Sequence, residues 1–160
     1  MLIFFDTEFT GLEVEPSLIS IGLISQDGRE FYAELSDTYQ MSDCNEFVQE
    51  AVLPYLTGGD VLIPMRELTI RLASWLTNFK EPIQLCTDSI AWDWPWILEL
   101  FADCGTWPKN MSRTPKELHQ SRRFNIVVER SFQNGLRRHH ALDDAKANRL
   151  GWQAVAAQSI

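Results

Sequence analysis

The chain begins with an apolar run that carries two acidic residues near its end. In MLIFFDTEFTGL, Asp6 and Glu8 follow the apolar residues 2–5 at a spacing of two. Residues i and i+2 of a β-strand point to the same face, so a strand here holds two carboxylates side by side. Such charges repel each other, and burial of either is costly unless something compensates it. A divalent cation would compensate them, whereas a strand end that faces water would need no cation.

Further candidate ligands stand at the starts of two expected helices. Asp93 follows a short buried strand and precedes Pro95, which we expect in the first helical turn, so a helix-capping role is the alternative. Near the C-terminus, His139 precedes an expected helix and Asp144 lies in its first or second turn. Oxygen ligands without cysteine suit Mg²⁺ or Mn²⁺. Two such ions about 4 Å apart can clamp the attacking and leaving oxygens of a phosphodiester. A neutral histidine nearby can take a proton from the attacking water.

The elements that must position these residues follow from the apolar periodicity. Strands are expected at residues 2–9, 18–25 and 30–35, the last two joined by a short Asp-Gly turn, which predicts an antiparallel start. A helix at 45–56 would share an apolar face through Phe47, Ala51 and Leu53, and a helix at 64–79 would have Pro64 in its first turn. The remaining expectations are a strand at 82–88, a helix at 92–105, a short helix at 114–120, a basic loop and a final helix at 140–158. This order predicts an α/β fold with helices packed on a mixed sheet.

Composition bounds the class of protein. A chain of 160 residues with 45% hydrophobic content is expected to form one domain, residues 1–160, with a proper core. We expect neither a signal peptide nor a membrane partner, because the first apolar run ends at Asp6 and no stretch approaches a membrane span. Cys44, Cys86 and Cys104 lack the count and spacing of a disulfide framework or a thiolate zinc site. They are expected to be reduced thiols in a cytoplasmic protein.

Charge is distributed unevenly within the net value of −8. Residues 1–108 hold 18 acidic and 4 basic residues, a net charge of −14, whereas residues 109–149 hold 10 basic and 4 acidic residues, a net charge of +6. This asymmetry indicates that the basic region binds an anionic partner locally, and not along an extended polyanion. The alternative is that the basic residues only form the solvent-exposed face of a helix.

As a set, the acidic motifs resemble the DEDDh family of 3′–5′ exonucleases, which has the ribonuclease-H-like fold. DTEFTGL resembles the first motif of that family, AWDWPWI the second, and HHALDDA the third, H-x-x-x-x-D. The three motifs occur in the family's order and span almost the whole chain. The closest resemblance is to the small bacterial and phage exoribonucleases.

This resemblance implies a role for each motif residue. Asp6 would bridge two ions of Mg²⁺ or Mn²⁺ in one active site, Glu8 and Asp144 would complete the first ion's ligands, and Asp93 would serve the second ion, partly through water. His139 would be the general base. Relatives also often form homodimers, so a homodimer is one expectation for this chain.

Two pairs of neighbours compete for roles in the third motif. The H-x-x-x-x-D spacing favours His139 over His140, although His140 is four residues before Asp144 and could face the same side of the helix. Adjacent helical residues diverge by about 100°, so only one of Asp143 and Asp144 should face the ions.

The second motif departs from the pattern of its relatives. An asparagine often precedes the motif aspartate in them, at a place that corresponds here to Thr87, Asp88 or Ser89. Asp88 is therefore a minor rival to Asp93.

The resemblance also implies a nucleic-acid substrate. Phe9 or Leu12, after the first motif, would stack on the terminal base, with an ordinary core position as the alternative. Arg137 and Arg138 would neutralise phosphates. The expected activity is a 3′–5′ exoribonuclease that acts on short or single-stranded RNA 3′ ends and releases nucleoside 5′-monophosphates. The alternatives are the same chemistry on single-stranded DNA, or a non-catalytic nucleic-acid-binding module, which should have lost at least one of the five motif residues. None of the five is missing.

Overall fold

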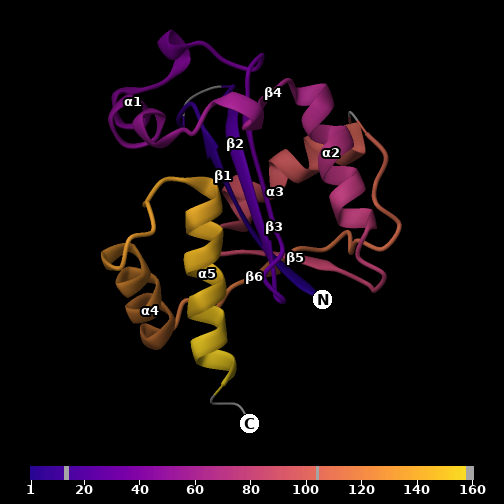
Figure 1. Cartoon of the computed structure of the whole chain (residues 1–160), viewed down its shortest axis with the longest axis vertical. Helices are drawn as coiled ribbons and strands as arrows, with labels where there is room; N and C mark the ends of the chain where they lie inside the picture. The colour runs from indigo at the N-terminus through magenta and orange to yellow at the C-terminus, as the bar shows by residue number, and fades with distance from the viewer. Residues whose placement is uncertain (13–14, 104, 158–160) are drawn as a thin grey trace.

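A six-stranded sheet in the order β4-β3-β2-β1-β5-β6 forms the centre of the molecule (Figure 1). The computed structural model describes residues 1–12, 15–103 and 105–157. The strands are β1 (Leu2–Phe9), β2 (Leu18–Ser25), β3 (Glu30–Leu35), β4 (Leu62–Ile63), β5 (Gln84–Thr87) and β6 (Lys116–Glu117). β1, β2 and β3 are antiparallel, and β1–β5, β5–β6 and β3–β4 are parallel pairs. The expected α/β fold, a mixed sheet with an antiparallel start, is confirmed.

Helices cover both faces of the sheet (Figure 1). They are α1 (Glu46–Ala51), α2 (Met65–Thr77), α3 (Ile90–Leu98), α4 (Arg122–Gln133) and α5 (Ala141–Ala156). Short 3₁₀ turns lie at Met41–Asp43, Leu53–Tyr55 and Gly59–Val61, and a π-helical turn, Glu99–Asp103, extends α3. The main core lies between the sheet and the pair α2 and α3. A second core lies on the opposite face under α4 and α5, and a third lies under α1.

The central strand β1 is covered on both faces, which explains its uninterrupted apolar run. Ile3 and Phe5 lie in the core under α2 and α3, whereas Phe4 lies in the core under α4 and α5. Asp6 and Glu8 continue the alternation of Phe4 and therefore lie on the α5 side of the strand. The two carboxylates thus stand at the end of a buried strand, beside the last helix.

A glycine in β2 allows α5 to approach the sheet beside the first motif. Gly22 pairs with Asp6 across the β1–β2 ladder. A Cβ atom at Gly22 would lie 2.2 Å from the backbone nitrogen of Leu142 and 2.4 Å from the carbonyl carbon of Ala141. No residue with a Cβ atom fits at this position, because real Cβ atoms essentially never lie this close to another heavy atom. The first turn of α5, which carries Asp144, is therefore seated directly against the strand that carries the first motif.

Two expectations for residues 114–139 are wrong. The short helix expected at 114–120 is the two-residue strand β6, which pairs with β5. The expected basic loop contains the 12-residue helix α4. Ser121 caps this helix by accepting a hydrogen bond from the backbone nitrogen of Phe124, and Phe124 and Val128 pack into the core while the basic side chains face outwards.

Three helix expectations also need correction in detail. Helix α1 ends at Ala51 and buries Val48, whereas Phe47, expected on the apolar face, is 55% exposed. Pro64 is the residue before α2 and not part of its first turn. Helix α3 begins at Ile90, so Pro95 lies in its interior and Asp93 lies in its first turn. The strand expected at 82–88 and the final helix are confirmed, with α5 slightly shorter than expected.

The cysteines carry no sign of disulfide pairing where they are described. Cys44 and Cys86 are buried free thiols, and Cys104 lies outside the described residues. Within the described ranges, no helix is long and apolar enough to cross a membrane.

Candidate active site

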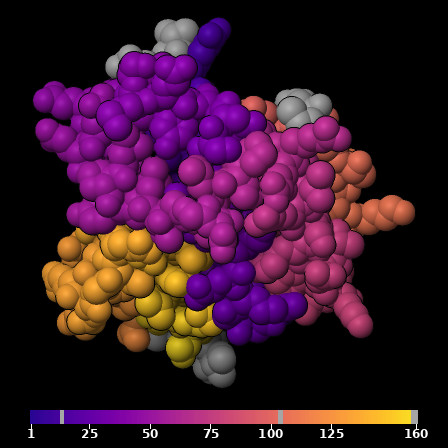
Figure 2. All heavy atoms as spheres, turned by 45° about the horizontal axis from the view of Figure 1, so that its top comes forward, coloured from indigo at the N-terminus to yellow at the C-terminus, as the bar shows by residue number. Residues whose placement is uncertain are grey.

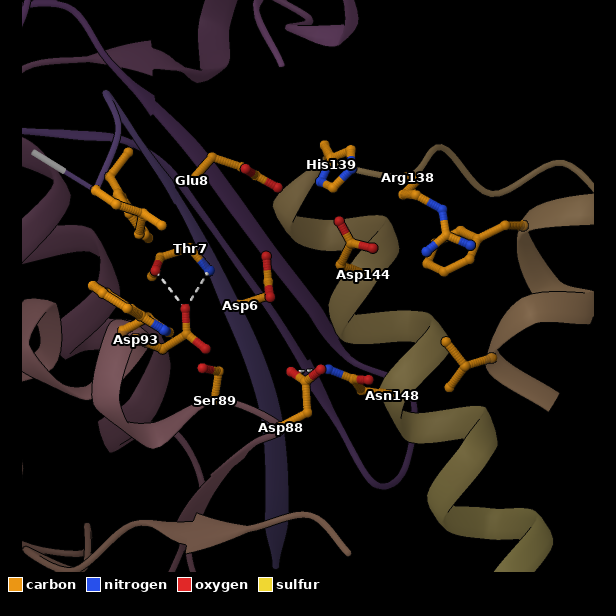
Figure 3. Close-up of a pocket in the computed structure, with 15 residues that line it drawn as sticks. Asp6, Thr7, Glu8, Asp88, Ser89, Asp93, Arg138, His139, Asp144 and Asn148 are labelled. Carbon is orange, nitrogen blue, oxygen red and sulfur yellow. Dashed lines mark hydrogen bonds between the residues drawn. The ribbon is translucent and has the colours of Figure 1, made fainter. Parts of the chain in front are cut away.

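A cleft of about 460 Å³ opens at the C-terminal end of β1, between α3 and α5. The motif residues line it together with side chains from α4 (Figure 3). The lining residues are Asp6, Thr7, Glu8, Phe9, Leu12, Asp88, Ser89, Trp92, Asp93, Val128, Phe132, Arg138, His139, Asp144 and Asn148.

The acidic residues form two adjacent groups with the spacing of metal ligands. One ligand atom from each of Glu8, His139 and Asp144 lies within 4.8 Å of the others. One carboxylate oxygen from each of Asp6, Asp88 and Asp93 does the same. All four motif carboxylates and the motif histidine therefore meet in one cleft, although they come from three separate parts of the chain.

Asp93 is oriented by two threonines whose role the sequence did not indicate. It is only 3% exposed, and its Oδ1 accepts hydrogen bonds from the backbone nitrogen of Thr7 at 3.2 Å and from Thr7 Oγ1 at 2.6 Å. Its Oδ2 accepts a hydrogen bond from the Thr87 hydroxyl. Thr7 lies between the two acids of the first motif, so these bonds connect the first and second motifs directly (Figure 3).

The two adjacent aspartates of the third motif diverge as the helical geometry requires. Asp144 lines the cleft, and its Oδ2 accepts a hydrogen bond from the backbone nitrogen of His140 at 3.1 Å. Asp143 points away and accepts hydrogen bonds from Arg137, from the backbone nitrogen at 3.1 Å and from Nε at 2.7 Å. Of the two, Asp144 is the one that faces the cleft.

The two histidines also differ in their surroundings. His139 lines the cleft and has a left-handed backbone, with φ of 60°. His140 is the N-cap of α5, where its Nδ1 accepts a hydrogen bond from the backbone nitrogen of Asp143 at 3.4 Å. Its ring is buried and stacks on Tyr32, with ring centroids 4.5 Å apart. Of the two, His139 is the one that faces the carboxylates.

Asp88 lines the cleft, as Asp93 does. Its Oδ1 accepts a hydrogen bond from Nδ2 of Asn148 at 2.8 Å, and Asn148 lies one helical turn after Asp144 (Figure 3). The sequence offered Asp88 as a rival to Asp93, but the structure brings both into the same group. The spacing of four residues between Asp144 and Asn148 is the signal that could have pointed to this pair.

Three of the four expected substrate-contacting residues line the cleft, and Arg137 does not. Leu12 is 65% exposed at the mouth of the cleft, while Phe9 lines it and stacks on Trp92 with centroids 6.3 Å apart. Arg138 also lines the cleft, where its guanidinium lies over Phe132. Arg137 does not line the cleft, because its side chain is bonded to Asp143 and to the carbonyl oxygen of Tyr55.

A family comparison agrees with this geometry. The model of the Rv2179c-like 3′–5′ exoribonuclease domain matches residues 1–156. The chain belongs to this family. Two curated relatives from Mycobacterium tuberculosis are the 3′–5′ exoribonucleases MT2234.1 of strain CDC 1551 / Oshkosh and Rv2179c of strain ATCC 25618 / H37Rv. Each is 32% identical over 128 residues, which cover 75% of this chain and 73% of the relative. The expectation of a 3′–5′ exonuclease, a hydrolase of phosphodiester bonds, is confirmed.

The carboxylates of this Rv2179c-like domain repel one another strongly. Burial and, to a smaller extent, the negative charges of Asp144 and Asp93 raise the pKa of Glu8 to about 8. Burial also holds the pKa of Asp6 well above its usual value, with contributions from Asp93, Asp144, Glu8 and Asp88 in that order. These side chains present oxygen atoms at ligand spacing with charge to be neutralised, so the donor set fits divalent cations such as Mg²⁺ or Mn²⁺.

At Asp93 and Asp144, hydrogen bonds to the carboxylate oppose the rise in pKa that burial causes. Burial raises the pKa of Asp93 to about 6, against the opposing effect of the bonds from Thr7 and Thr87. Burial raises the pKa of Asp144 to about 7, opposed by backbone hydrogen bonds from His140 and His139. The folded domain without cations therefore holds protons that the unfolded chain would release near neutral pH.

These shifts predict that the metal-free domain loses stability as pH rises. A carboxyl group whose pKa is higher in the folded state favours folding fully below its unfolded pKa, and this contribution is lost as pH passes the folded value. For Glu8, Asp93 and Asp144 the window runs from about pH 4 to about pH 8. In EDTA, the melting temperature should fall by several degrees between pH 5 and pH 8, and Mn²⁺ should restore it at pH 8 by binding the folded state.

Glu8→Gln provides the matched control, because it removes one of the shifted carboxyl groups. Its melting temperature in EDTA should depend less on pH than that of the unmodified domain. A melting temperature that is equal or higher at pH 8 than at pH 5, in EDTA, contradicts the electrostatic account of the cleft.

Proposed function

We propose that this domain hydrolyses the 3′-terminal phosphodiester bond of RNA with two divalent cations, as in the DEDDh nucleases of ribonuclease-H-like fold. The observation that carries the proposal is the meeting of Asp6, Glu8, Asp93, Asp144 and His139 in one cleft. Membership of an exoribonuclease family supports RNA as the substrate.

Each carboxylate has a proposed place in the cation sites. Asp6 would bridge the two ions, Glu8 and Asp144 would complete the first site, and Asp93 would hold the second ion, partly through water. Asp6 and Asp93 share one group of ligand atoms, and Glu8 and Asp144 share the other, which supports the assignment of Glu8 and Asp144 to one site and of Asp93 to the other. When bound, the cations stabilise the negative charge on the attacking and leaving oxygens.

His139 is the proposed general base. Burial lowers the pKa of its imidazole, and the positive charge of Arg138 lowers it further, so the ring is neutral near pH 7 and can accept a proton. It lies with Glu8 and Asp144 at the cleft wall. A water molecule held there would lose its proton to the imidazole while its oxygen attacks phosphorus.

The products follow from the bond that breaks. Attack by water on the last phosphodiester breaks the bond between phosphorus and the 3′ oxygen of the preceding nucleotide. The released nucleotide then carries a 5′ phosphate, and the 3′ oxygen of the shortened RNA takes up a proton from solvent and becomes a new 3′ hydroxyl. Arg138 would bind a phosphate, and Leu12 and Phe9 would contact the terminal base, since apolar side chains can stack on any base.

This route predicts a strict dependence on the chemistry of the 3′ end. With Mn²⁺, a 5′-labelled RNA oligomer with a 3′ hydroxyl should give a ladder of shortened products and free nucleoside 5′-monophosphates. A 3′ phosphate should block digestion, because it adds charge and bulk where the terminal hydroxyl must fit, and a 5′ phosphate should have no effect. Gel electrophoresis and chromatography of the nucleotides measure both results.

DNA of the same sequence and a circular RNA provide the comparison substrates. Faster digestion of single-stranded DNA than of RNA overturns the assignment of RNA as the substrate. Release of 3′-phosphates, or cleavage of the circular RNA, places the domain among endonucleases and contradicts the proposed route.

A further inference from the structure

Helix α1 and the turn after it lie against the loop that carries His139. We call residues 45–55 the α1 segment. Phe47, on its first turn, contacts the imidazole of His139 edge to face, with ring centroids 5.0 Å apart and an interplanar angle of 82°. Figure 2 shows the purple surface around α1 meeting the orange and yellow surface of the C-terminal helices. The contact therefore joins two parts of the chain that are far apart in sequence.

Phe47 is not a core residue. It is 55% exposed, whereas Val48 and Val52 attach the same helix to the core through Ile19 and Cys44. More than half of Phe47 therefore remains in water, and its contact with the His139 imidazole is made at the surface and not within a core.

The orientation of the His139 side chain must be held by contacts with neighbouring residues. Its backbone φ of 60° is rare for a residue with a side chain, so the loop must be held by its surroundings. In the part of the chain that the structure describes, no hydrogen bond fixes either ring nitrogen of His139. His140 differs, because its ring is stacked on Tyr32 and bonded to the backbone of Asp143. The Phe47 ring packs against the His139 imidazole and therefore limits its rotation.

The α1 segment is itself attached to the active site at both ends. At the start, the backbone nitrogen of Asn45 donates a hydrogen bond to the carbonyl oxygen of Thr10 at 3.0 Å. A Cβ atom at Gly11, the glycine of the first motif, would lie 2.7 Å from Nδ2 of Asn45, so glycine allows this close approach. At the other end, Nη1 of Arg137 donates a hydrogen bond to the carbonyl oxygen of Tyr55 at 3.3 Å.

We propose that Phe47 is a positioning residue for His139: its ring holds the imidazole in the orientation that faces the carboxylates. Gly11 and Arg137 place the α1 segment so that this contact can form. The inference rests on the proposed role of His139 as general base. A small displacement of a base can cost up to about 100-fold in rate, so an edge contact made outside the cleft can control turnover.

Steady-state kinetics on an RNA oligomer with Mn²⁺ separate positioning from substrate binding. Phe47→Ala should lower kcat by roughly 10- to 100-fold and leave KM nearly unchanged. Phe47→Tyr, which keeps the ring, should restore kcat. Ile70→Ala is the matched control, because Ile70 is a similarly exposed apolar residue on α2 and should change neither constant. Calorimetry should show the same Mn²⁺ affinity for Phe47→Ala as for the unmodified domain.

A double-mutant cycle tests whether Phe47 acts through His139. In a His139→Ala background, Phe47→Ala should cause no further loss of kcat, since the side chain that it positions is absent. In NMR spectra, the ring proton resonances of His139 should shift in Phe47→Ala, where the neighbouring ring current is lost, and return towards their original positions in Phe47→Tyr.

Several results would overturn the inference. They are an unchanged kcat in Phe47→Ala, a rise in KM alone, an equal loss in the His139→Ala background, or unmoved His139 resonances. If His139→Ala itself turns over normally, the general-base proposal fails and the positioning role fails with it. A slow His139→Ala beside a normal Phe47→Ala overturns the positioning role only.

Discussion

Replacement of Asp6 by asparagine should abolish RNA hydrolysis while making the metal-free domain more stable. Asp6 is proposed to contact both cations, so its loss removes several kcal/mol of charge stabilisation from the transition state. Since each 1.4 kcal/mol changes the rate about tenfold, kcat/KM should fall by roughly 1000-fold or more. Initial rates on a 5′-labelled RNA oligomer measure this loss.

The stability of the same variant supplies the internal control. Burial and, after it, the charges of Asp93, Asp144 and Glu8 raise the pKa of Asp6. Asparagine has nearly the same shape without the charge. The melting temperature of Asp6→Asn in EDTA at pH 8 should therefore exceed that of the unmodified domain. Asp93→Asn should cost less activity, because only one ion depends on it. An active Asp6→Asn variant would contradict the bridging role.

His139→Ala should lower kcat by roughly 10²- to 10⁴-fold, the loss typical of a general base. Its affinity for Mn²⁺ should persist, because His139 is not proposed as a cation ligand. The rate of the unmodified domain should rise with pH as the imidazole loses its proton, and the lowered pKa of His139 places this ascending limb below the usual range for histidine. The limb should disappear in the variant.

His140→Ala is the matched comparison for this prediction. His140 is buried and caps α5, so its loss should lower the melting temperature and reduce kcat much less than loss of His139. Loss of the ascending limb in His140→Ala, with its retention in His139→Ala, would reverse the assignment of the base. If neither variant slows turnover, no histidine of this motif accepts the proton.

The strands around the first motif could be predicted from the sequence because their signals are local. The apolar residues of β1, β2 and β3, and the Asp-Gly turn between the last two, suffice to place all three. Strand β6 could not be predicted in this way. It has two residues and exists only through its pairing with β5, a contact between distant parts of the chain.

Helix α4 had a local signal that its charge obscured. Ser121 is a good N-cap, and Phe124 and Val128 are four residues apart, which is a helical spacing. The density of arginines in this region favoured a loop. In the folded molecule those side chains occupy the solvent-facing side of an amphipathic helix, so the charge and the helix are compatible.

The motif residues of the cleft could be named from the sequence, but their supports could not. The motifs point to Asp6, Glu8, Asp93, Asp144 and His139, and the fold brings them together. The supporting contacts join residues far apart in the chain: Thr7 with Asp93, Asp88 with Asn148, and Phe47 with His139. Only Asn148 had a local signal, its spacing of four residues from Asp144. The contacts themselves depend on the packing of separate elements.

The two-cation cleft is tested most directly by anomalous X-ray diffraction from crystals of the domain grown with Mn²⁺ and a nucleoside 5′-monophosphate. The account predicts two manganese peaks about 4 Å apart, both next to the Asp6 carboxylate, one also near Glu8 and Asp144 and the other on the side of Asp93. A single peak, peaks away from Asp6, or no peak in the cleft at saturating Mn²⁺ would contradict it.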